Sequence, residues 1–363
     1  MKLAVALLVA ACGSAAAQPQ PPLSPTAPAP PTAPTAFTPL ADPDLQLIAT
    51  PAADHAPFVQ AIDAAATSID LAMFHLTDKQ VVYALQRAAT RGVAVRVIID
   101  HDSVKAKANQ RAYDSLRTRG VPIRRSSKQF SITHEKAMVV DGKIAFVTAI
   151  NLTNDVDKTR DLGVITRAPD VVSDVAALFE ADWTNADGQG HVTPAQRAAS
   201  LVVSPTSSRG KLVALLGSAQ KTVDLTVENL GDPAIVDAIV AAAKRGATVR
   251  AIVPACDKNP DELYNLPAAQ QLATAGVAVR MMPAPEAADT PYMHSKMILV
   301  DGHVAYIGSV NFSGNSLAHA RELGVIVDSA VAGGQIRATF EADFGHAVAP
   351  PTARPASCRA IGH

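Results

Sequence analysis

The sequence has few cysteines, almost no net charge and no convincing group of metal ligands. Of its three cysteines, Cys12 lies in a leader, and neither Cys256 nor Cys358 resembles a catalytic thiol. A formal net charge of −1 argues against a protein whose whole surface binds nucleic acid, so any anion-binding feature must be local. Because no cluster of His, Cys, Asp and Glu has metal-ligand spacing, we expect no metal and no cofactor. Apolar residues make up 48% of the 363 residues, which is enough for one large domain or two ordinary ones.

The first 17 residues are typical of an export signal, with one early lysine, a short apolar run and then small residues. The apolar run is too short to span a membrane comfortably as a helix. Two processing sites compete, because Cys12 ends a stretch that resembles a bacterial lipobox, whereas the alanines before Gln18 suit ordinary signal peptidase. We therefore expect an exported protein, located in a bacterial periplasm, anchored as an outer-membrane lipoprotein, or secreted.

Proline is concentrated near the start of the chain. Ten prolines fall between Pro19 and Pro43, a composition that cannot form a core and favours extended polyproline structure, so residues 18–45 are predicted to be a linker. Residues 348–363 are predicted to be a loose tail unless Cys358 holds them. In an oxidising compartment the even pair Cys256 and Cys358 favours a disulfide, although nothing in the sequence requires the two to meet.

An internal repeat organises the rest of the chain. "SIDLAMFHLTD" at residues 68–78 returns as "TVDLTVENLGD" at residues 222–232, and "TRDLGVI" returns as "ARELGVI". Residues 46–195 and 196–347 are therefore predicted to be two homologous domains, which we call the first half and the second half. Each half alternates β-branched runs with alanine-rich amphipathic segments, a pattern typical of an α/β domain whose sheet is covered by helices.

A hairpin sequence that contains histidine and lysine occurs once in each half. "THEKAMVVDGK" begins at residue 133 and "MHSKMILVDGH" at residue 293. Residues i and i+2 of a strand face the same side, so His134 and Lys136 should project together, as should His294 and Lys296. An imidazole beside an ammonium suits a phosphate, which lysine attracts as a point charge and histidine can attack or protonate near neutral pH.

The dipeptide Asp-Gly predicts a two-residue turn in both hairpins. Such a turn pairs residue 140 with 143 and residue 300 with 303, and it places each histidine opposite the residue 15 positions later, Ala149 or Ser309. The first copy has Thr148-Ala149 where the second has Gly308-Ser309, so it lacks the hydroxyl that Ser309 provides at this position. The amides predicted on the same face are Asn151 and Asn311, and the turn carboxylates, predicted to be structural only, are Asp141 and Asp301.

The spacing His-x-Lys-(x)4-Asp, present twice with Asn ten residues after each Asp, resembles the HKD motif of the phospholipase D superfamily. The resemblance covers about residues 46–346. It implies two homologous αβ domains, each a mixed β-sheet flanked by helices, packed about a pseudo-twofold axis with one shared active site. Because one chain carries both half-sites, a monomer is expected.

The resemblance also implies a role for each site residue. His134 attacks phosphorus to form a phosphohistidine, while His294 protonates the leaving alcohol and then activates water. Asp161 and Glu322 each follow a motif and are implied to orient a histidine, the alternative being that both are ordinary exposed carboxylates. The groups implied to hold the phosphate oxygens are Lys136, Lys296, Asn151, Asn311 and Ser309.

Some residues near the motifs have two interpretations. Three residues at strand ends either reach the site or serve in capping and packing: His75, Glu228 and Asn229. Three aromatic residues that flank the motifs either line a substrate entrance or belong to the core: Phe130, Tyr292 and Phe312.

Two substrate classes are compatible with these motifs. The first is a phospholipid head-group ester at a membrane surface, with hydrolysis or transfer to another alcohol. The second is nucleic acid, whose backbone Arg124, Arg125 and Lys128 would follow. Export and the near-neutral charge favour the lipid. A catalytically inactive envelope binding protein is a third alternative, which the two intact His-Lys pairs disfavour.

Overall fold

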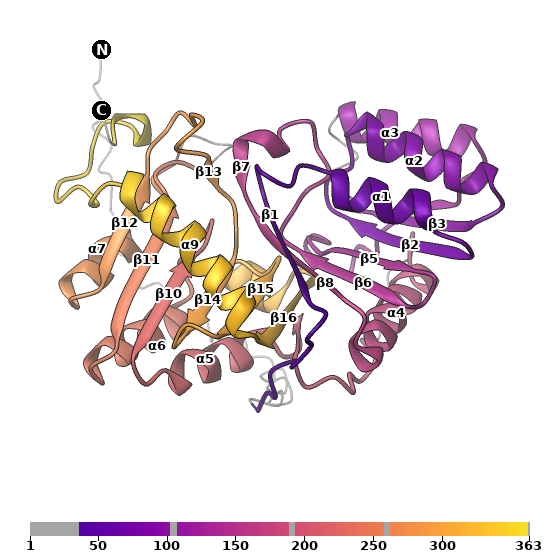
Figure 1. Cartoon of the computed structure of the whole chain (residues 1–363). Helices are drawn as coiled ribbons and strands as arrows, with labels where there is room; N and C mark the ends of the chain where they lie inside the picture. Colours follow the sequence, from indigo (N-terminus) through magenta and orange to yellow (C-terminus); the bar gives the residue numbers. More distant parts are fainter. Residues whose placement is uncertain (1–35, 102–106, 189–192, 258–261, 362–363) are drawn as a thin grey trace, which may run out of the picture. The chain divides into compact units, whose positions relative to one another are not determined.

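The computed structural model describes residues 36–101, 107–188, 193–257 and 262–361. The predicted export signal and most of the predicted linker lie outside these residues and stay predictions. The described residues form two similar α/β halves (Figure 1), which confirms the predicted fold class. Within this part of the chain, no helix has the length and hydropathy that a bilayer crossing requires.

Most elements of the two halves match and follow one another in the same order. The first comprises β1 (Gln46–Ala49), α1 (Ala56–Ala64), β2 (Ser68–Met73), α2 (Lys79–Thr90), β3 (Ala94–Ile99), α3 (Lys107–Thr118), β4 (Ile123–Arg125), β5 (Lys136–Val140), β6 (Ile144–Thr148), η2 (Val156–Lys158), β7 (Thr159–Arg160), β8 (Leu162–Thr166) and α4 (Pro169–Thr184). The second comprises β9 (Leu201–Ser204), α5 (Ser208–Ser218), β10 (Thr222–Thr226), α6 (Pro233–Lys244), β11 (Thr248–Pro254), α7 (Leu266–Thr274), β12 (Ala278–Met282), β13 (Tyr292–Met293), β14 (Met297–Val300), β15 (Val304–Gly308), α8 (Gly314–Ala318), β16 (Glu322–Asp328), α9 (Ala330–His346) and η3 (Cys358–Ala360).

The two sheets have the same topology. The first runs β1-β8-β6-β5-β2-β3-β4, and the second, read in the same direction, runs β9-β16-β15-β14-β10-β11-β12. Strands β2 and β3 are parallel, whereas β5 is antiparallel to both β2 and β6, so the sheet is mixed as predicted. In each sheet the histidine–lysine hairpin occupies the centre, which places its chemistry at the ends of well-buried strands.

Helices cover the outer faces of the sheets, α1–α3 on the first and α5–α7 on the second (Figure 1). Equivalent aspartates begin α2 and α6, since Asp78 accepts the N–H of Val81 at 2.9 Å and Asp232 that of Ile235 at 3.3 Å. Just after the α2 C-cap, Gly92 has a φ of 90°, in the left-handed region that favours glycine. The repeated sequence therefore codes for repeated helix boundaries.

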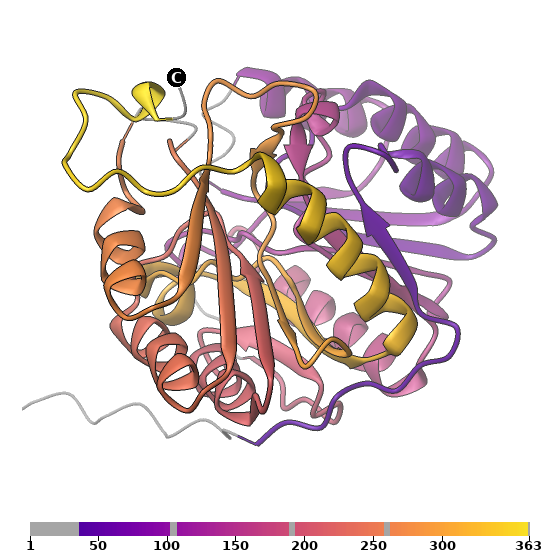
Figure 2. The ribbon, with the colours of Figure 1, turned by 60° about the vertical axis from the view of Figure 1, so that its left-hand side comes forward.

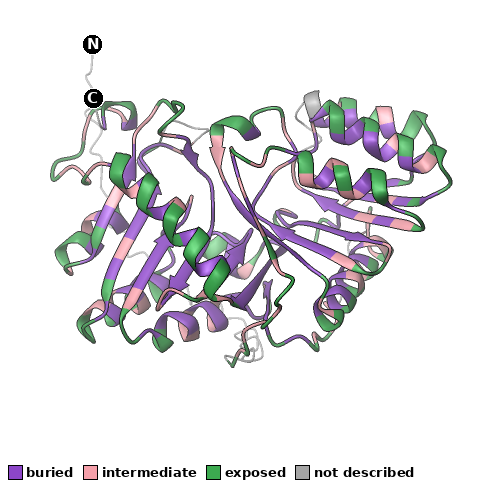
Figure 3. Cartoon of the chain, viewed as in Figure 1, coloured by how far each residue is buried: buried purple, intermediate pink, exposed green. Residues whose placement is uncertain are grey.

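A second core lies between the two sheets. Strands β6 and β8 contact β15 and β16, and Val147 and Val164 of the first half share one buried cluster with Ile307 and Val325 of the second. Helix α9 crosses the strands of the second sheet obliquely and contacts β10, β12, β14 and β15 (Figure 2). Figure 3 shows that these inner strands are buried almost throughout, while exposed residues are concentrated on the helices. The apolar packing therefore joins the halves along their hairpin strands.

The hairpin turns correct the predicted register. Residues 140–143 form a turn with positive φ at Asp141 (53°) and Gly142 (62°), closed by the N–H of Lys143 on the carbonyl of Val140 at 3.0 Å. The ladder nevertheless pairs Val140 with Ile144, and Val300 with Val304 in the second half, so each hairpin has one extra residue beside its turn. The predicted pairs 140–143 and 300–303 are therefore wrong, and so is the placement of the histidines opposite Ala149 and Ser309.

Both predicted ends of the folded region also need correction. Leu40, assigned to the linker, exchanges backbone hydrogen bonds with β16, as its N–H donates to Ile326 at 2.8 Å and its carbonyl accepts from Asp328 at 2.8 Å. The tail was predicted to be loose unless Cys358 held it, and Cys358 does hold it through a disulfide with Cys256, the alternative that the even pair of cysteines favoured. Val348 and Met281 add mutual backbone hydrogen bonds at 2.9 and 2.7 Å. Backbone pairing and a covalent bond thus hold both segments on the second half.

Candidate active site

Each motif histidine is held by a carboxylate of the opposite half. His134 Nδ1 lies 2.9 Å from Glu322 Oε2, and His294 Nδ1 lies 2.7 Å from Asp161 Oδ1. All four groups are buried, so the two carboxylates are not ordinary exposed side chains. A carboxylate on Nδ1 fixes that nitrogen as the protonated one and leaves Nε2 for the substrate.

The backbone makes the same crossed connection. The N–H of His134 donates to the carbonyl of Arg321 at 2.8 Å, and the N–H of His294 donates to the carbonyl of Arg160 at 3.1 Å. Strand β13 accordingly runs parallel to β7 of the first half. His134 and His294 thus precede the first paired residue of their own sheet, and their backbone is hydrogen-bonded to the opposite half instead.

The arginines that precede these carboxylates are also fixed across the interface. Arg160 makes a paired contact with Asp343 at 2.7 and 2.9 Å, and Arg321 bonds Asp182 at 2.9 and 3.2 Å. These aspartates belong to the repeated sequences "FEADW" and "FEADF" on α4 and α9. The repeat therefore places a guanidinium anchor directly before each histidine-orienting carboxylate.

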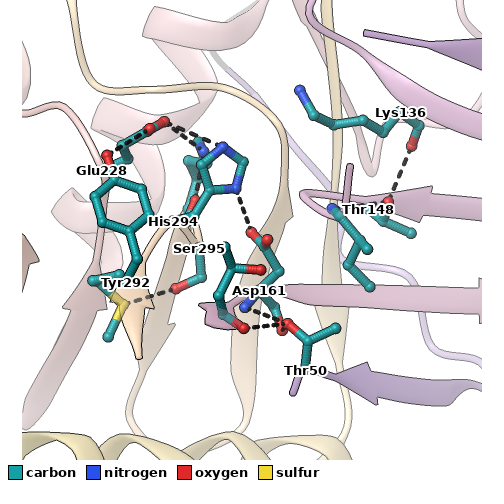
Figure 4. A network of polar contacts seen from close by, with 12 residues as sticks. Thr50, Lys136, Thr148, Asp161, Glu228, Tyr292, His294 and Ser295 are labelled. Atoms are coloured by element: carbon teal, nitrogen blue, oxygen red, sulfur yellow. Dashed lines mark hydrogen bonds and ion pairs between the residues drawn. The ribbon is translucent and has the colours of Figure 1, made fainter. Parts of the chain in front are cut away.

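The two imidazoles meet at the interface. Their ring centroids are 6.4 Å apart and their planes differ by 65°. Figure 4 shows His294 between Asp161, which holds its Nδ1, and Glu228, with Lys136 projecting from the first half toward the same region. The structure thus brings together the two histidines that the sequence places 160 residues apart.

The lysines are buried beside their own histidines. Lys136 Nζ donates to the carbonyl of His134 at 2.6 Å, and Lys296 Nζ donates to that of His294 at 2.5 Å. Burial, followed by the nearby charge of Lys296, lowers the pKa of Lys136 to about 7. Among the described residues no carboxylate pairs directly with Lys136, whose Nζ lies 4.9 Å from the centre of the Phe74 ring.

The surroundings of His134 favour its neutral form. Burial lowers the pKa of His134, while Glu322 acts in the opposite direction. The Phe74 ring meets it edge-on at 4.7 Å between centroids. His75 stands beside them, 3.2 Å from Asn109, and burial lowers its pKa to about 3, so it is neutral at physiological pH. His75 therefore reaches the site, which was one of the two interpretations of this residue from the sequence.

The predicted phosphate-binding amides differ in their contacts. Asn311 accepts the N–H of Asn229 at 3.0 Å and donates to Glu228 at 3.2 Å. Asn151 Oδ1, in contrast, is buried and has no hydrogen-bond partner among the described residues. Ser309 Oγ bonds the carbonyl and N–H of Leu323 at 3.2 and 3.1 Å, so in this structure its hydroxyl serves the strand that carries Glu322.

Two further side chains complete the site. Glu228 Oε2 lies 2.9 Å from Lys296 Nζ and 3.5 Å from His294 Nε2, and its Oε1 accepts the hydroxyl of Tyr292 at 3.0 Å. Both residues had two interpretations from sequence, and both reach the site. Ser316 was missed, yet its Oγ donates to Glu322 at 2.7 Å. A hydroxyl on a short helix after the second motif carries no sequence pattern that would have revealed this contact.

The remaining predicted residues lie elsewhere. The carboxylate of Asp141 accepts the N–H groups of residues 66–68, and that of Asp301 those of residues 220–222, so each fixes the segment before a strand. Burial alone would raise the pKa of Asp141, but these backbone N–H groups hold it below its usual range. Phe312 is fully buried against Tyr306 and belongs to the core, and Arg321 covers the ring of buried Phe130 at 4.7 Å.

The predicted basic patch is partly engaged within the protein. Arg124 stacks on Trp183 at 4.2 Å and donates to its carbonyl at 2.8 Å, while Arg125 lies 5.2 Å from the centre of the Tyr113 ring. Lys128 is exposed and, with His319, lines an open cavity of about 490 Å³. Two of the three cations therefore stack on aromatic rings of the protein itself.

Both halves of the chain resemble known proteins. The family described as "Cardiolipin synthase, PLD-like domain" matches residues 58–183 and 212–344. Cardiolipin synthase of Geobacillus thermodenitrificans is 26% identical over 303 residues, which are 73% of this chain and 58% of that protein. Cardiolipin synthase A of Pseudomonas aeruginosa is 27% identical over 358 residues, 85% of this chain and 68% of that protein. The chain thus spans little more than half the length of the first of these relatives.

A solved structure shares the fold over nearly the whole molecule. The phosphatidylserine synthase of Haemophilus influenzae superposes with a TM-score of 0.66 at 12% identity, covering 86% of this chain and 88% of that one. At this identity the likeness describes the arrangement of the two halves and nothing finer.

Proposed function

Because this chain belongs to the phospholipase D superfamily, we propose that it cleaves or transfers a phospholipid head-group phosphodiester through a phosphohistidine. The observation that carries this proposal is the meeting of His134 and His294, one from each half, with ring centroids 6.4 Å apart and each Nδ1 held by a carboxylate. Both half-sites belong to one chain, which supports catalysis by a monomer.

The first step uses both histidines. Nε2 of neutral His134 attacks phosphorus, and the bond from phosphorus to the leaving alcohol breaks as His294 donates a proton to that oxygen. Glu322 steadies the positive charge that develops on His134, and Asp161 keeps His294 in the orientation for proton donation. The lowered pKa of His134 supports its role as nucleophile, since attack requires the unprotonated nitrogen.

The second step reverses the first with a new acceptor. Water or another alcohol loses its proton to His294 and attacks the phosphohistidine, and the bond from phosphorus to His134 breaks. Water gives hydrolysis and an alcohol gives transfer. In both steps Lys136, Lys296, Asn151 and Asn311 are proposed to stabilise the charge on the non-bridging oxygens.

Several observations support a lipid over a nucleic acid. The named relatives are cardiolipin synthases, and the leader is typical of export to the cell envelope, where phospholipids are abundant. Arg124 and Arg125 are engaged with aromatic rings, which weakens the case for a nucleic-acid track. We extend the proposal to an exported protein at a membrane surface, either periplasmic, anchored through Cys12 as an outer-membrane lipoprotein, or secreted.

The test compares substrates with one protein preparation. The full chain is incubated with vesicles of phosphatidylcholine or phosphatidylglycerol, or with single-stranded DNA, in the presence of a chelator, beside the variant His134→Ala. We expect release of the head group or its transfer to added alcohol, and loss of both in the variant. Cleavage of DNA without lipid turnover would replace the lipid with nucleic acid, and binding without turnover of either would indicate an inactive binding protein.

A further inference from the structure

In the second half, the carboxylate of Glu228 lies among the groups that the proposed reaction uses to bind the phosphate. Glu228 follows β10 and its side chain is 12% exposed. Its two oxygens contact Lys296, Asn311 and Tyr292 at 2.9, 3.2 and 3.0 Å. Figure 4 shows Glu228 facing His294 on the side opposite Asp161. An anion within the protein thus shares the donors that a substrate anion needs.

The internal repeat shows that the fold does not require a carboxylate here. The residue of the first half that matches Glu228, 154 positions earlier, is Phe74. Its ring contacts His134 and Lys136, the equivalents of the residues that Glu228 contacts in the second half. Two otherwise similar half-sites therefore differ in charge, one being apolar beside its lysine and the other carrying a paired carboxylate.

The carboxylate also changes the charge of the whole site. Two lysines, Lys136 and Lys296, face three carboxylates, which are Asp161, Glu322 and Glu228. Burial would raise the pKa of Glu228, but His294 and Lys296 hold it well below its usual range, so it is ionised at neutral pH. Without Glu228 the lysines would balance the remaining carboxylates, and any anion would meet a more positive site.

We propose that Glu228 selects ligands by charge, so that the site accepts a phosphodiester with one negative charge and disfavours a phosphomonoester with two. This inference rests on the proposed function, because it concerns the same phosphate position. Of the three N–H groups of Lys296, two are bonded to His294 and Glu228, and Asn311 gives one of its two to Glu228. One donor on each remains for a non-bridging oxygen, and a further ionised oxygen would face the carboxylate. Hydrolysis of a diester yields a monoester, so the same repulsion favours product release.

The experiment measures binding and needs no turnover. Diethyl phosphate and ethyl phosphate are titrated by calorimetry into the full chain at pH 7, where the first carries one negative charge, the second carries about 1.5 to 2, and Lys136, whose pKa is about 7, is still partly protonated. The variant Glu228→Gln keeps the size and an acceptor oxygen but removes the charge. Glu180→Gln is the matched control, because Glu180 pairs with Arg96 and is 56% exposed on the first half.

We expect the unmodified protein to bind diethyl phosphate more tightly than ethyl phosphate. In Glu228→Gln the affinity for ethyl phosphate should rise about tenfold, the effect of one partly screened charge, and that for diethyl phosphate about threefold at most. The Glu180→Gln protein should match the unmodified one. Equal changes for both ligands, or none, would overturn the proposal.

Two further measurements protect the test from misfolding of the variant. Glu228→Asp keeps the charge, so it should keep the preference for the diester, and loss of that preference would contradict the proposal. The unmodified protein is itself decisive, because tighter binding of ethyl phosphate than of diethyl phosphate would contradict it without any variant. A charge preference without lipid turnover would reject only the proposed reaction, whereas lipid turnover without a charge preference would reject only the role of Glu228.

Discussion

Replacement of His294 by alanine should affect substrates according to how much help their leaving group needs. In the proposed first step, Nε2 of His294 protonates the leaving alcohol while Asp161 holds Nδ1 at 2.7 Å. General acid catalysis contributes about 10²–10⁴-fold, or about 2.7–5.4 kcal/mol of barrier, for a poor leaving group. With a p-nitrophenyl phosphodiester as substrate, the p-nitrophenolate leaves without a proton. Its release in the first turnover should therefore slow by less than about tenfold in His294→Ala.

The same variant should accumulate the intermediate. His294 is also the base of the second step, so His294→Ala should release about one p-nitrophenolate per protein molecule in a burst and then turn over slowly. Stopped-flow absorbance measures the burst, and mass spectrometry after an alkaline quench locates the adduct, expected on His134. Asp161→Asn should show the same dependence on leaving group to a smaller degree, because it acts through His294.

Two results would refute this assignment. An equal loss of rate with the ordinary phospholipid and the p-nitrophenyl ester would show that His294 does not protonate the leaving group. A burst in His134→Ala, with the adduct on His294, would reverse the two roles.

Four other predictions concern pH and stability. Because burial and then Lys296 lower the pKa of Lys136 to about 7, kcat/KM should fall as pH rises through about 7, and constant activity up to pH 9 would contradict this. The unfolded chain binds the Lys136 proton up to about pH 10.4, so this group should make unfolding free energy rise with pH between those values, as denaturant titrations can measure. Joint replacement of Cys256 and Cys358 by serine opens a loop of 102 residues. It should lower the unfolding free energy by about 2–4 kcal/mol while turnover is retained. An unchanged denaturation midpoint would show that the disulfide does not stabilise the protein. A chain that begins at residue 46 should unfold about 4 °C below one that begins at residue 36, because it loses the two backbone hydrogen bonds of Leu40, each worth about 1 kcal/mol; equal melting temperatures would count against that role.

Much of the site could be predicted because its sequence motif occurs once in each half of the chain. A single His-x-Lys pair means little, but His134 and His294 recur in register with their lysines, their Asp-Gly turns and the "RDLGV" and "RELGV" strands. The same repeat predicted two homologous α/β halves. Local patterns such as strand alternation and Asp-Gly turns depend on neighbouring residues, and a sequence displays them directly.

The hairpin register shows where local reasoning stopped. Asp141 and Gly142 do form a turn, yet one extra residue beside it shifts the predicted pairing, and the histidines take their backbone partners from Arg160 and Arg321 in the opposite half. Those partners are far away in sequence, so no turn rule includes them. The extra residue beside each turn is identified only from the strand pairing in the structure.

Sequence alone determined that the chain has two like halves and that each supplies one histidine, one lysine and one carboxylate. Only the tertiary structure decided that the carboxylates are exchanged, with Glu322 on His134 and Asp161 on His294, and that Glu228 stands where the first half has Phe74. The physical reason is that these contacts form between surfaces that meet only after each half has folded. A repeat specifies what each half contains, whereas packing across the interface decides which half completes the other.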